Sequence, residues 1–211
     1  MKRIKRPIHR VPLEEYKDIT INPIENNTID YALFKEKELT NKEDYRIIFD
    51  VCKFEKTNIT NNVFQRSEFI DCIFINSDLS NNTFVNCTFM RCEFINCKLI
   101  GSHFIESYIE NTLIKSSIAD LLDIANSKIK LFAVKETSMK DSSWFENKVD
   151  GMEFSKNDFT KATFFKTPLK DVSIGSCEID KLRIDHPSVK GLQIASHQAE
   201  TFCDLLGIKV I

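Results

Sequence analysis

The sequence predicts an all-β protein in which short strands stack into a four-sided coil. Three observations predict this fold class: a large hydrophobic residue recurs every five residues, a small residue precedes it by two, and the pattern changes with a longer period of twenty. The composition is that of a globular protein, since 42% of the 211 residues are hydrophobic and 28% are charged. No apolar stretch approaches the roughly 20 residues that a bilayer-spanning helix needs.

Phenylalanine marks the five-residue period. Thirteen of the 17 phenylalanines have numbers ending in 4 or 9, and the other positions in that register are mostly aliphatic. From Phe49 to Ile194 there are 30 such centres, and only Ala119 is not a large hydrophobic residue. A period of five fits neither a helix nor a plain strand, so it indicates a short extended segment followed by a sharp turn. The predicted core stack contains Phe54, Phe64, Phe69, Phe74, Phe84, Phe89, Phe94 and Phe104.

The twenty-residue period sets the number of sides. Residues 57–76 laid over 77–96 share eight identities, and a non-aromatic centre recurs every twenty residues. Four pentapeptides therefore make one circuit, and residue n lies beneath residue n+20. The 30 centres, at four per coil, make 7.5 coils. At about 4.8 Å per coil they form a rod roughly 36 Å long. The upstream centres Ile24, Ile29, Phe34 and Leu39 predict one more coil, and residues 40–46 a loop or distorted corner.

Six of the seven cysteines fall in the column of small residues two positions before the centres. There a free cysteine acts as a small hydrophobic side chain. Cys52, Cys72 and Cys92 share one column at a spacing that a disulfide tolerates, but their side chains point the same way. We expect free thiols in a reducing compartment. No cysteine or histidine spacing typical of a zinc site occurs.

The sequence contains no recognisable catalytic or cofactor motif. Its four histidines, His9, His103, His186 and His197, are scattered, and no GxGxxG, P-loop, HExxH or GxSxG pattern is present. With only 5 glycines, phosphate-cradling loops are not expected. We therefore expect no catalytic residues, no metal and no cofactor, and predict a non-enzymatic protein; a site for an unrecognised enzyme would need a pocket.

The first twenty residues differ from the rest in charge. Residues 1–12 carry five Lys or Arg and no acid, with no apolar run typical of a signal peptide behind them. Residues 1–20 have a net charge of +3 against −5 for residues 21–211. Residues 1–20 are interpreted as a basic tail or cap, with a phosphate-contacting arm as the alternative. No direct binding of nucleic acid and no membrane association are expected, and the predicted location is the cytoplasm.

The C-terminal residues leave the five-residue pattern after Ile194. Ser196 can cap a helix whose apolar face is followed by Gly207 and a short strand. Residues 21–195 are thus the predicted β-helix and residues 196–211 a helix and strand. This segment could be a lid on the exposed strand edges, but its length and apolarity favour a two-fold dimer. The predicted dimer interface contains Leu192, Ile194, Ala199, Phe202, Leu205, Leu206, Ile208 and Val210.

The repeat resembles the pentapeptide-repeat family. The segments CTFMR (87–91), CEFIN (92–96) and CKLIG (97–101) match its motif of a small residue, a polar residue, a central Leu or Phe and two variable positions. The resemblance covers about 150 residues and implies a right-handed quadrilateral parallel β-helix.

Two further segments resemble the Qnr-type and MfpA-type members of that family. They are SSWFEN (142–147) and the C-terminal pairs and triplets Gly191–Leu192, Gln198–Ala199, Leu206–Gly207–Ile208 and Val210–Ile211. This resemblance implies a homodimer that binds DNA gyrase or topoisomerase IV, partly mimics duplex DNA and protects the enzyme from fluoroquinolones. Acidic residues aligned along one rod face would make the contact, and the candidates are Glu68, Glu106, Glu110, Asp123 and Glu146. The alternative is a general interaction scaffold with an unrelated partner.

Overall fold

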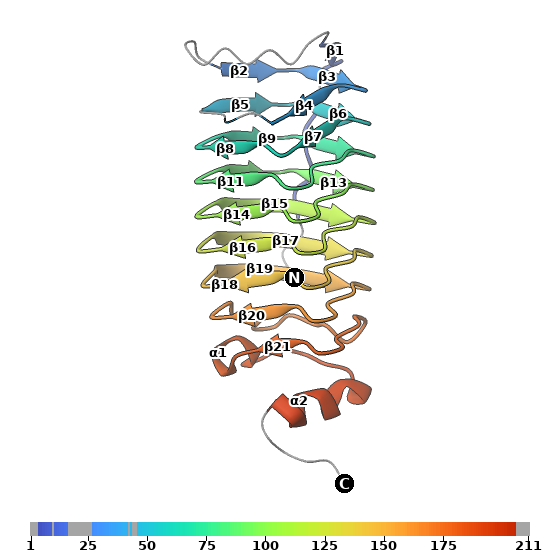
Figure 1. Ribbon diagram of the computed structural model, residues 1–211, viewed down its shortest axis with the longest axis vertical. Coiled ribbons are helices and arrows are strands. Elements are labelled where there is room, and N and C mark those ends of the chain that lie inside the picture. The colour runs from blue at the N-terminus through green and yellow to red at the C-terminus, as the bar shows by residue number, and fades with distance from the viewer. Residues whose placement is uncertain (1–3, 10, 17–26, 42, 44–45, 206–211) are drawn as a thin grey trace.

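The chain forms a parallel β-solenoid of about eight turns that ends in a short helix (Figure 1). The computed structural model describes residues 4–9, 11–16, 27–41, 43 and 46–205. Consecutive coils pair in parallel with a register of twenty, so that Phe74 lies between Phe54 and Phe94. The predicted all-β coil and the stacking of n on n+20 are confirmed.

Each coil has four sides, which we name the Phe69, Phe74, Leu79 and Phe84 faces after one centre on each. The Phe69 face contains β2 (Asn27–Asp30), β5 (Ile47–Asp50), β9 (Glu68–Ile70) and β12 (Thr88–Met90). The Phe74 face contains β3 (Ala32–Lys35), β6 (Lys53–Glu55), β10 (Ile73–Ile75) and β13 (Glu93–Ile95). Three long strands turn the corner between these two faces, namely β15 (Tyr108–Lys115), β17 (Lys128–Lys135) and β19 (Lys148–Ser155).

The other two faces are built from shorter strands. The Leu79 face contains β4 (Glu38–Thr40) and β7 (Asn58–Thr60), and its later coils pair through single bridges. The Phe84 face contains β8 (Val63–Gln65), β11 (Thr83–Val85), β14 (His103–Ile105), β16 (Asp123–Ala125), β18 (Ser143–Phe145), β20 (Thr163–Phe165) and β21 (Arg183–Ile184). At the N-terminal end of the rod, β1 (Glu14–Glu15) pairs with β3.

Most corners of the described coils have a residue in the left-handed backbone region, and Ser176 is an exception. The corner residue lies two positions after each centre, as at Asn61 and Asn81, which both have a φ of 57°. This conformation raises the free energy of L-residues, and it does so less for asparagine than for most others. The next coil supplies compensation, because the corner amide donates to a carbonyl there, as Asn81 does to Ile100 at 2.8 Å.

The core is a set of stacked rings inside the coil. The Phe54 and Phe74 rings are 4.5 Å apart and nearly parallel, and Phe69 and Phe89 stack at 4.7 Å. All eight phenylalanines of the expected core stack are buried. Phe132 is outside the five-residue register but is also buried, because it occupies an inward position normally held by a small residue.

The column of small residues is a hydrogen-bonded ladder as well as a packing device. The Cys92 thiol donates to the Phe69 carbonyl at 3.1 Å, and the Asn82 amide donates to the Ile59 carbonyl at 2.6 Å. All seven cysteines are free thiols. Burial raises the pKa of Cys87 to about 12 and that of Cys97 to about 11. These thiols therefore remain protonated at neutral pH and serve the core as hydrogen-bond donors.

The coil changes character near its C-terminal end. Helix α1 (His186–Val189) replaces a strand, so Val189, expected at a centre, lies in a helix. A 3-10 helix (Ser196–Gln198) then leads into α2 (Ala199–Leu205), which lies beyond the last coil in Figure 1. None of the helices in the described part of the chain is long and apolar enough to cross a membrane.

The expected helix cap at Ser196 is wrong. The N-cap position is Ala195, and Ser196 is already the first residue of the 3-10 helix. Gln198 takes over the capping role because its side chain reaches both ways: Oε1 accepts from the Ala195 amide at 3.0 Å, and Nε2 donates to the carbonyls of Ile174 and Cys177. One buried glutamine thereby ties the helix to the final coil. The strand expected at residues 208–211 lies outside the described residues.

Candidate partner-binding faces

The five acidic candidates do not share one face. Asp123 lies on the Phe84 face, Glu68 and Glu110 lie on the Phe69 face, and Glu106 and Glu146 lie at the corner between these faces. The expectation that they align along one face is therefore wrong. Residues share a column only when their numbers differ by a multiple of twenty, which holds for Glu106 and Glu146 alone.

Three of these carboxylates are neutralised by neighbouring cations. Glu146 pairs with Lys166 at 2.6 Å, Glu110 with Lys130 at 2.7 Å and Glu68 with Arg46 at 3.8 Å, while Asp123 Oδ2 lies 3.5 Å from His103 Nδ1. The hydrogen bond from Lys130, assisted by Tyr108, lowers the pKa of Glu110. Among the described residues, only Glu106 of the five has no ion-pair partner. The candidates therefore do not form a continuous row of phosphate-like charges.

Sorting the outward residues by columns of twenty shows an exposed apolar column on the Phe84 face. We call it the apolar ridge, and it consists of Val85, Ile105, Ala125, Phe145 and Phe165. Phe145 and Phe165 are 39% and 37% exposed, and their rings are 5.5 Å apart. At about 4.8 Å per coil, the ridge is roughly 19 Å long.

Three of the acidic candidates border this ridge. Glu106 follows Ile105 in the chain and Glu146 follows Phe145, so both carboxylates lie along one side of the column. Asp123 lies on the other side, on β16 with Ala125. Lys166 both pairs with Glu146 and lies 5.2 Å from the Phe165 ring centre. The middle of the ridge is thus apolar, and its border carries both carboxylates and the Lys166 cation.

The Leu79 face carries acids that the sequence reasoning missed. Its outward carboxylates include Asp120, which accepts from the Ser138 hydroxyl, and two that pair with lysines: Asp78 with Lys98 and Asp158 with Lys140. Glu178 and Asp180 continue the face toward the C-terminal end. The signal that could have found them is the n+20 column, applied to outward positions as it was applied to centres.

The basic N-terminal residues form a strap along the side of the rod. Residues 4–9, here called the strap, run lengthwise across the corner between the Phe69 and Phe74 faces, from β19 toward the N-terminal end (Figure 1). They are neither a cap on the rod end nor a free tail, because they contact five successive coils. The Lys5 amide donates to Asn111 Oδ1 at 3.0 Å, and the Ile8 amide donates to Asp71 Oδ1 at 3.0 Å.

Two buried carboxylates anchor the strap. Arg6 Nε lies 3.2 Å from Glu93 Oε1, and the Glu93 side chain is 10% exposed. Asp71 is held by Arg91 through two hydrogen bonds of 2.7 and 2.6 Å, and its backbone carbonyl contacts His9 Nε2 at 2.8 Å. Buried charges are tolerated when they are paired and hydrogen-bonded, and here part of that pairing comes from the strap.

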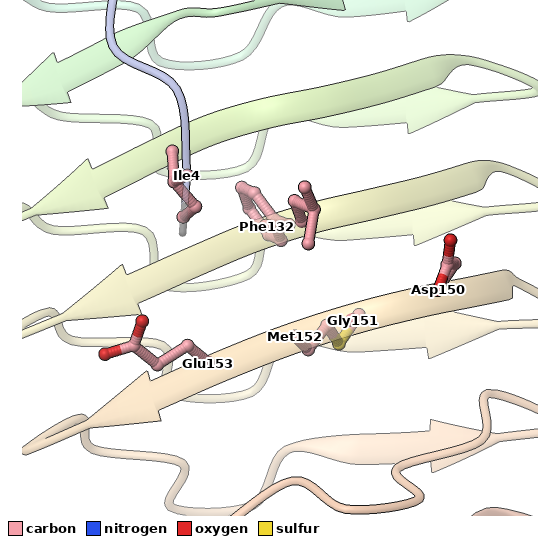
Figure 2. Close-up of a pocket in the computed structure, with 7 residues that line it drawn as sticks. Ile4, Phe132, Asp150, Gly151, Met152 and Glu153 are labelled. Atoms are coloured by element: carbon pink, nitrogen blue, oxygen red, sulfur yellow. The ribbon is translucent and has the colours of Figure 1, made fainter. Parts of the chain in front are cut away.

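A cavity of about 150 Å³ lies at the beginning of the strap (Figure 2). Ile4, Leu131, Phe132 and Met152 supply its apolar wall, and Asp150 and Glu153 lie at its edges. Gly151 forms the corner here with a φ of +93°, where a Cβ would come within 3.2 Å of the Leu131 side chain. Glycine therefore keeps this part of the corner open.

The residues proposed for a dimer interface are only partly described. Ile194 is 38% exposed and Ala199 is exposed, whereas Leu192 and Phe202 pack against the core. Leu205 ends α2. Leu206, Ile208 and Val210 lie outside the described residues.

Neither metal-binding chemistry nor a membrane helix marks a site in the described part of the chain. No group of three or more His, Cys, Asp or Glu residues there could hold a metal ion. The described candidates are therefore surfaces, namely the apolar ridge, the Leu79 face and the strap corner. The strap corner is the corner between the Phe69 and Phe74 faces that residues 4–9 cross.

Comparison with known proteins identifies the repeat. The family model for pentapeptide repeats matches residues 72–111 as eight copies. No curated protein matches the sequence. Among solved structures, HetL, a pentapeptide repeat protein involved in heterocyst differentiation regulation from the cyanobacterium Nostoc sp. strain PCC 7120, is 10% identical with a TM-score of 0.42, covering 81% of this chain and 92% of HetL.

QnrB1, described as a plasmid-mediated fluoroquinolone resistance protein, also matches. A trypsin-treated form is 17% identical with a TM-score of 0.33, covering 89% of this chain and 100% of QnrB1. The full-length form is 16% identical with a TM-score of 0.31, covering 83% and 100%. Residues 72–111 of this chain are pentapeptide repeats, and the solenoid continues the same five-residue period on both sides of them.

Proposed function

We propose that this protein is a non-enzymatic rod that binds another protein through the apolar ridge on its Phe84 face. The ridge carries the proposal, because two large aromatic side chains stand exposed in one column with smaller apolar residues stacked beside them. Aromatic side chains exposed side by side are typical of protein-interaction surfaces. Of the carboxylates along the border, Glu106 has no cation beside it among the described residues, so it would favour a partner with a basic residue next to its apolar centre.

The finer proposal is that the partner is DNA gyrase or topoisomerase IV, and that binding protects the enzyme from fluoroquinolones. Its support is the resemblance of residues 142–147 and of the C-terminal segment to Qnr-type proteins. Residues 142–147 include Trp144, Phe145 and Glu146, so this resemblance falls on the ridge itself. Because three of the five candidate carboxylates are paired with lysine or arginine, any mimicry of DNA would be partial and would rest on shape more than on charge.

We also propose that residues 196–211 form the homodimer module, next to the exposed side chain of Ile194. Ile194→Asp places a charge on this surface without disturbing the core, whereas Phe202 packs against the core and would confuse the result. The expected outcome is a shift from dimer to monomer mass by light scattering, with Ile118→Asp on the Leu79 face as the matched control. Unchanged mass for Ile194→Asp would place any interface elsewhere.

The topoisomerase proposal is tested by gyrase supercoiling with added protein, with and without ciprofloxacin. The wild-type protein should change supercoiling or restore it in the presence of the drug. The double variant Phe145→Ser and Phe165→Ser should lose this effect. The control double variant Ile118→Ser and Leu121→Ser removes exposed apolar side chains from other positions and should retain it.

The outcomes separate the two levels of the proposal. No effect of the wild-type protein in either condition rejects the topoisomerase as partner and leaves the general scaffold. A wild-type effect that survives loss of both phenylalanines rejects the ridge as the contact surface.

A further inference from the structure

The strap corner has the features of a recognition site for an extended peptide. We define the strap groove by Asp71, Glu93, Asn111 and the cavity beside Leu131 and Gly151. These residues follow one another along the rod, one coil after the next. From Gly151 to Asp71 there are four coil steps, or about 19 Å, and the five residue steps from Ile4 to His9 span about 17 Å when extended. The groove therefore suits a fully extended segment.

The groove contacts both the backbone and the side chains of the strap. Asn111 and Asp71 each accept a hydrogen bond from a strap amide, and Glu93 accepts the Arg6 guanidinium. Pro7 has no N–H of its own to satisfy, and it holds the preceding residue in an extended conformation. Apolar Ile4 reaches the cavity wall, and the Lys5 charge lies near Glu110. The recognised pattern is thus an apolar residue, two basic residues and a proline, followed by a residue held through its amide.

Charge complementarity favours a basic occupant. Asp71 and Glu93 are both more than nine-tenths buried, and Asp150 and Glu153 border the cavity. Arg91 compensates Asp71 from within the rod, whereas the arginine that pairs with Glu93 comes from the strap. The groove consequently retains a need for one cation from its occupant.

The strap itself fills this groove only loosely. The Arg6 side chain is 78% exposed, Ile8 is 45% exposed, and the cavity of about 150 Å³ beside Ile4 remains open. A permanently packed element would bury these side chains. An occupant with a larger apolar side chain at the Ile4 position would fill the cavity and bind more tightly.

We propose that the strap groove is a peptide-binding site, occupied in cis by residues 4–9, which a partner's extended segment of the same apolar–basic–basic–Pro chemistry takes by displacing the strap. This site is separate from the apolar ridge and does not depend on the identity of the partner that binds there. The strap then acts as a competitor that sets the affinity the partner segment must exceed.

The test uses a fluorescent synthetic peptide of residues 1–12 and the full-length protein. In Arg6→Glu, repulsion from Glu93 should release the strap, and the peptide should bind this variant at least about tenfold tighter than wild type by anisotropy, because the cis competitor is removed. Arg66→Glu makes the same charge change at an exposed corner away from the groove and should bind the peptide like wild type. Adding Glu93→Gln to Arg6→Glu should weaken peptide binding about tenfold, a loss of roughly 1.4 kcal/mol.

The outcomes are distinct from those of the ridge. Peptide binding by Arg6→Glu no tighter than by wild type and Arg66→Glu overturns the proposal. Should Arg6→Glu fail to fold by circular dichroism, hydrogen exchange of the wild type decides: excess peptide should speed exchange of the Lys5 and Ile8 amides, and unchanged exchange overturns the proposal. Loss of Phe145 and Phe165 should leave peptide binding unchanged, so failure of the ridge proposal does not affect this test.

Discussion

The strap corner and the apolar ridge differ in the residues that the same repeat carries at its outward positions. At the strap corner the outward positions include buried carboxylates, and the chain's own N-terminal residues lie across them. At the ridge the outward positions are apolar, and Phe145 and Phe165 stay 39% and 37% exposed although Lys166 lies over the Phe165 ring. In both regions the inward columns are apolar and stacked, so the regions differ in their outward columns.

Substitutions in the interior should have the largest effect on the free energy of unfolding, and the effects at the strap corner and the ridge are compared with it. Phe89→Ala should lower the free energy of unfolding by roughly 3–5 kcal/mol, because the ring stacks on Phe69 at 4.7 Å and Phe89 is paired on its other side with Ile109 of the next coil. Urea unfolding followed by circular dichroism measures it. A loss below about 1 kcal/mol would mean that neighbouring coils collapse into the space, and that inward columns are not the main source of stability.

The strap corner should show an intermediate effect. Asp71→Asn removes the charge that accepts two hydrogen bonds from Arg91, and should cost about 2 kcal/mol, within the range for hydrogen bonds to charged groups. Glu36→Gln is the matched control, since Glu36 also has a positive φ but pairs with Lys56 at 3.4 Å in an exposed position. Its cost should stay below about 0.5 kcal/mol. Equal costs in urea unfolding would remove the distinction between the buried and the exposed pair.

The ridge should contribute less to stability, per side chain, than the interior. Replacing both Phe145 and Phe165 with serine should lower the free energy of unfolding by about 1 kcal/mol for each ring, because each is already more than a third exposed. The same urea measurement applies. A loss as large as that of Phe89→Ala would show that the ridge is part of the core and is not a surface held for a partner.

The sequence predicts the interior well because inward positions obey one rule. Every five-residue centre must be apolar, and the n+20 register follows from the period, so the stacking of Phe54, Phe74 and Phe94 could be derived from the residue numbers. The same arithmetic, applied to outward positions, would also have found the ridge. Glu106 and Glu146 belong to one column for this reason, whereas Glu68 and Glu110 cannot.

The strap could not be derived in this way. Residues 4–9 contain no repeat, so nothing in their spacing relates them to Asp71 or Glu93, which lie more than sixty residues away in the chain. Their basic character indicated an anionic contact, and the contact turned out to be with the protein's own carboxylates. The capping at the end of the solenoid could not be predicted for a related reason. Gln198 donates hydrogen bonds to the carbonyls of Ile174 and Cys177, which lie more than twenty residues away, and no local sequence motif indicates such bonds.

The smallest expected effects concern two carboxylates of the Phe69 face whose pKa values are shifted in opposite directions. Burial, together with the nearby charges of Asp71 and Asp30, raises the pKa of Asp50, whereas Lys130 and Tyr108 lower the pKa of Glu110. An ionised group with a raised pKa destabilises the folded state above that pKa, and one with a lowered pKa stabilises it. At pH 7, Asp50→Asn should therefore raise the melting temperature slightly and Glu110→Gln should lower it.

Both differences should disappear in acid, where the wild-type carboxylates are protonated in the folded and unfolded chains alike. For Glu110 the stabilisation is present above the unfolded pKa and is lost as the pH falls through the lower, folded value; for Asp50 the cost vanishes as the pH falls below the unfolded value, about 3.9. Thermal unfolding of the wild type and both variants between pH 7 and pH 3 measures this. A shift of the melting temperature in the same direction for both variants at pH 7 would contradict this comparison. It would mean that the surroundings of Asp50, which lies near Asp71, are no more negative than those of Glu110, which pairs with Lys130.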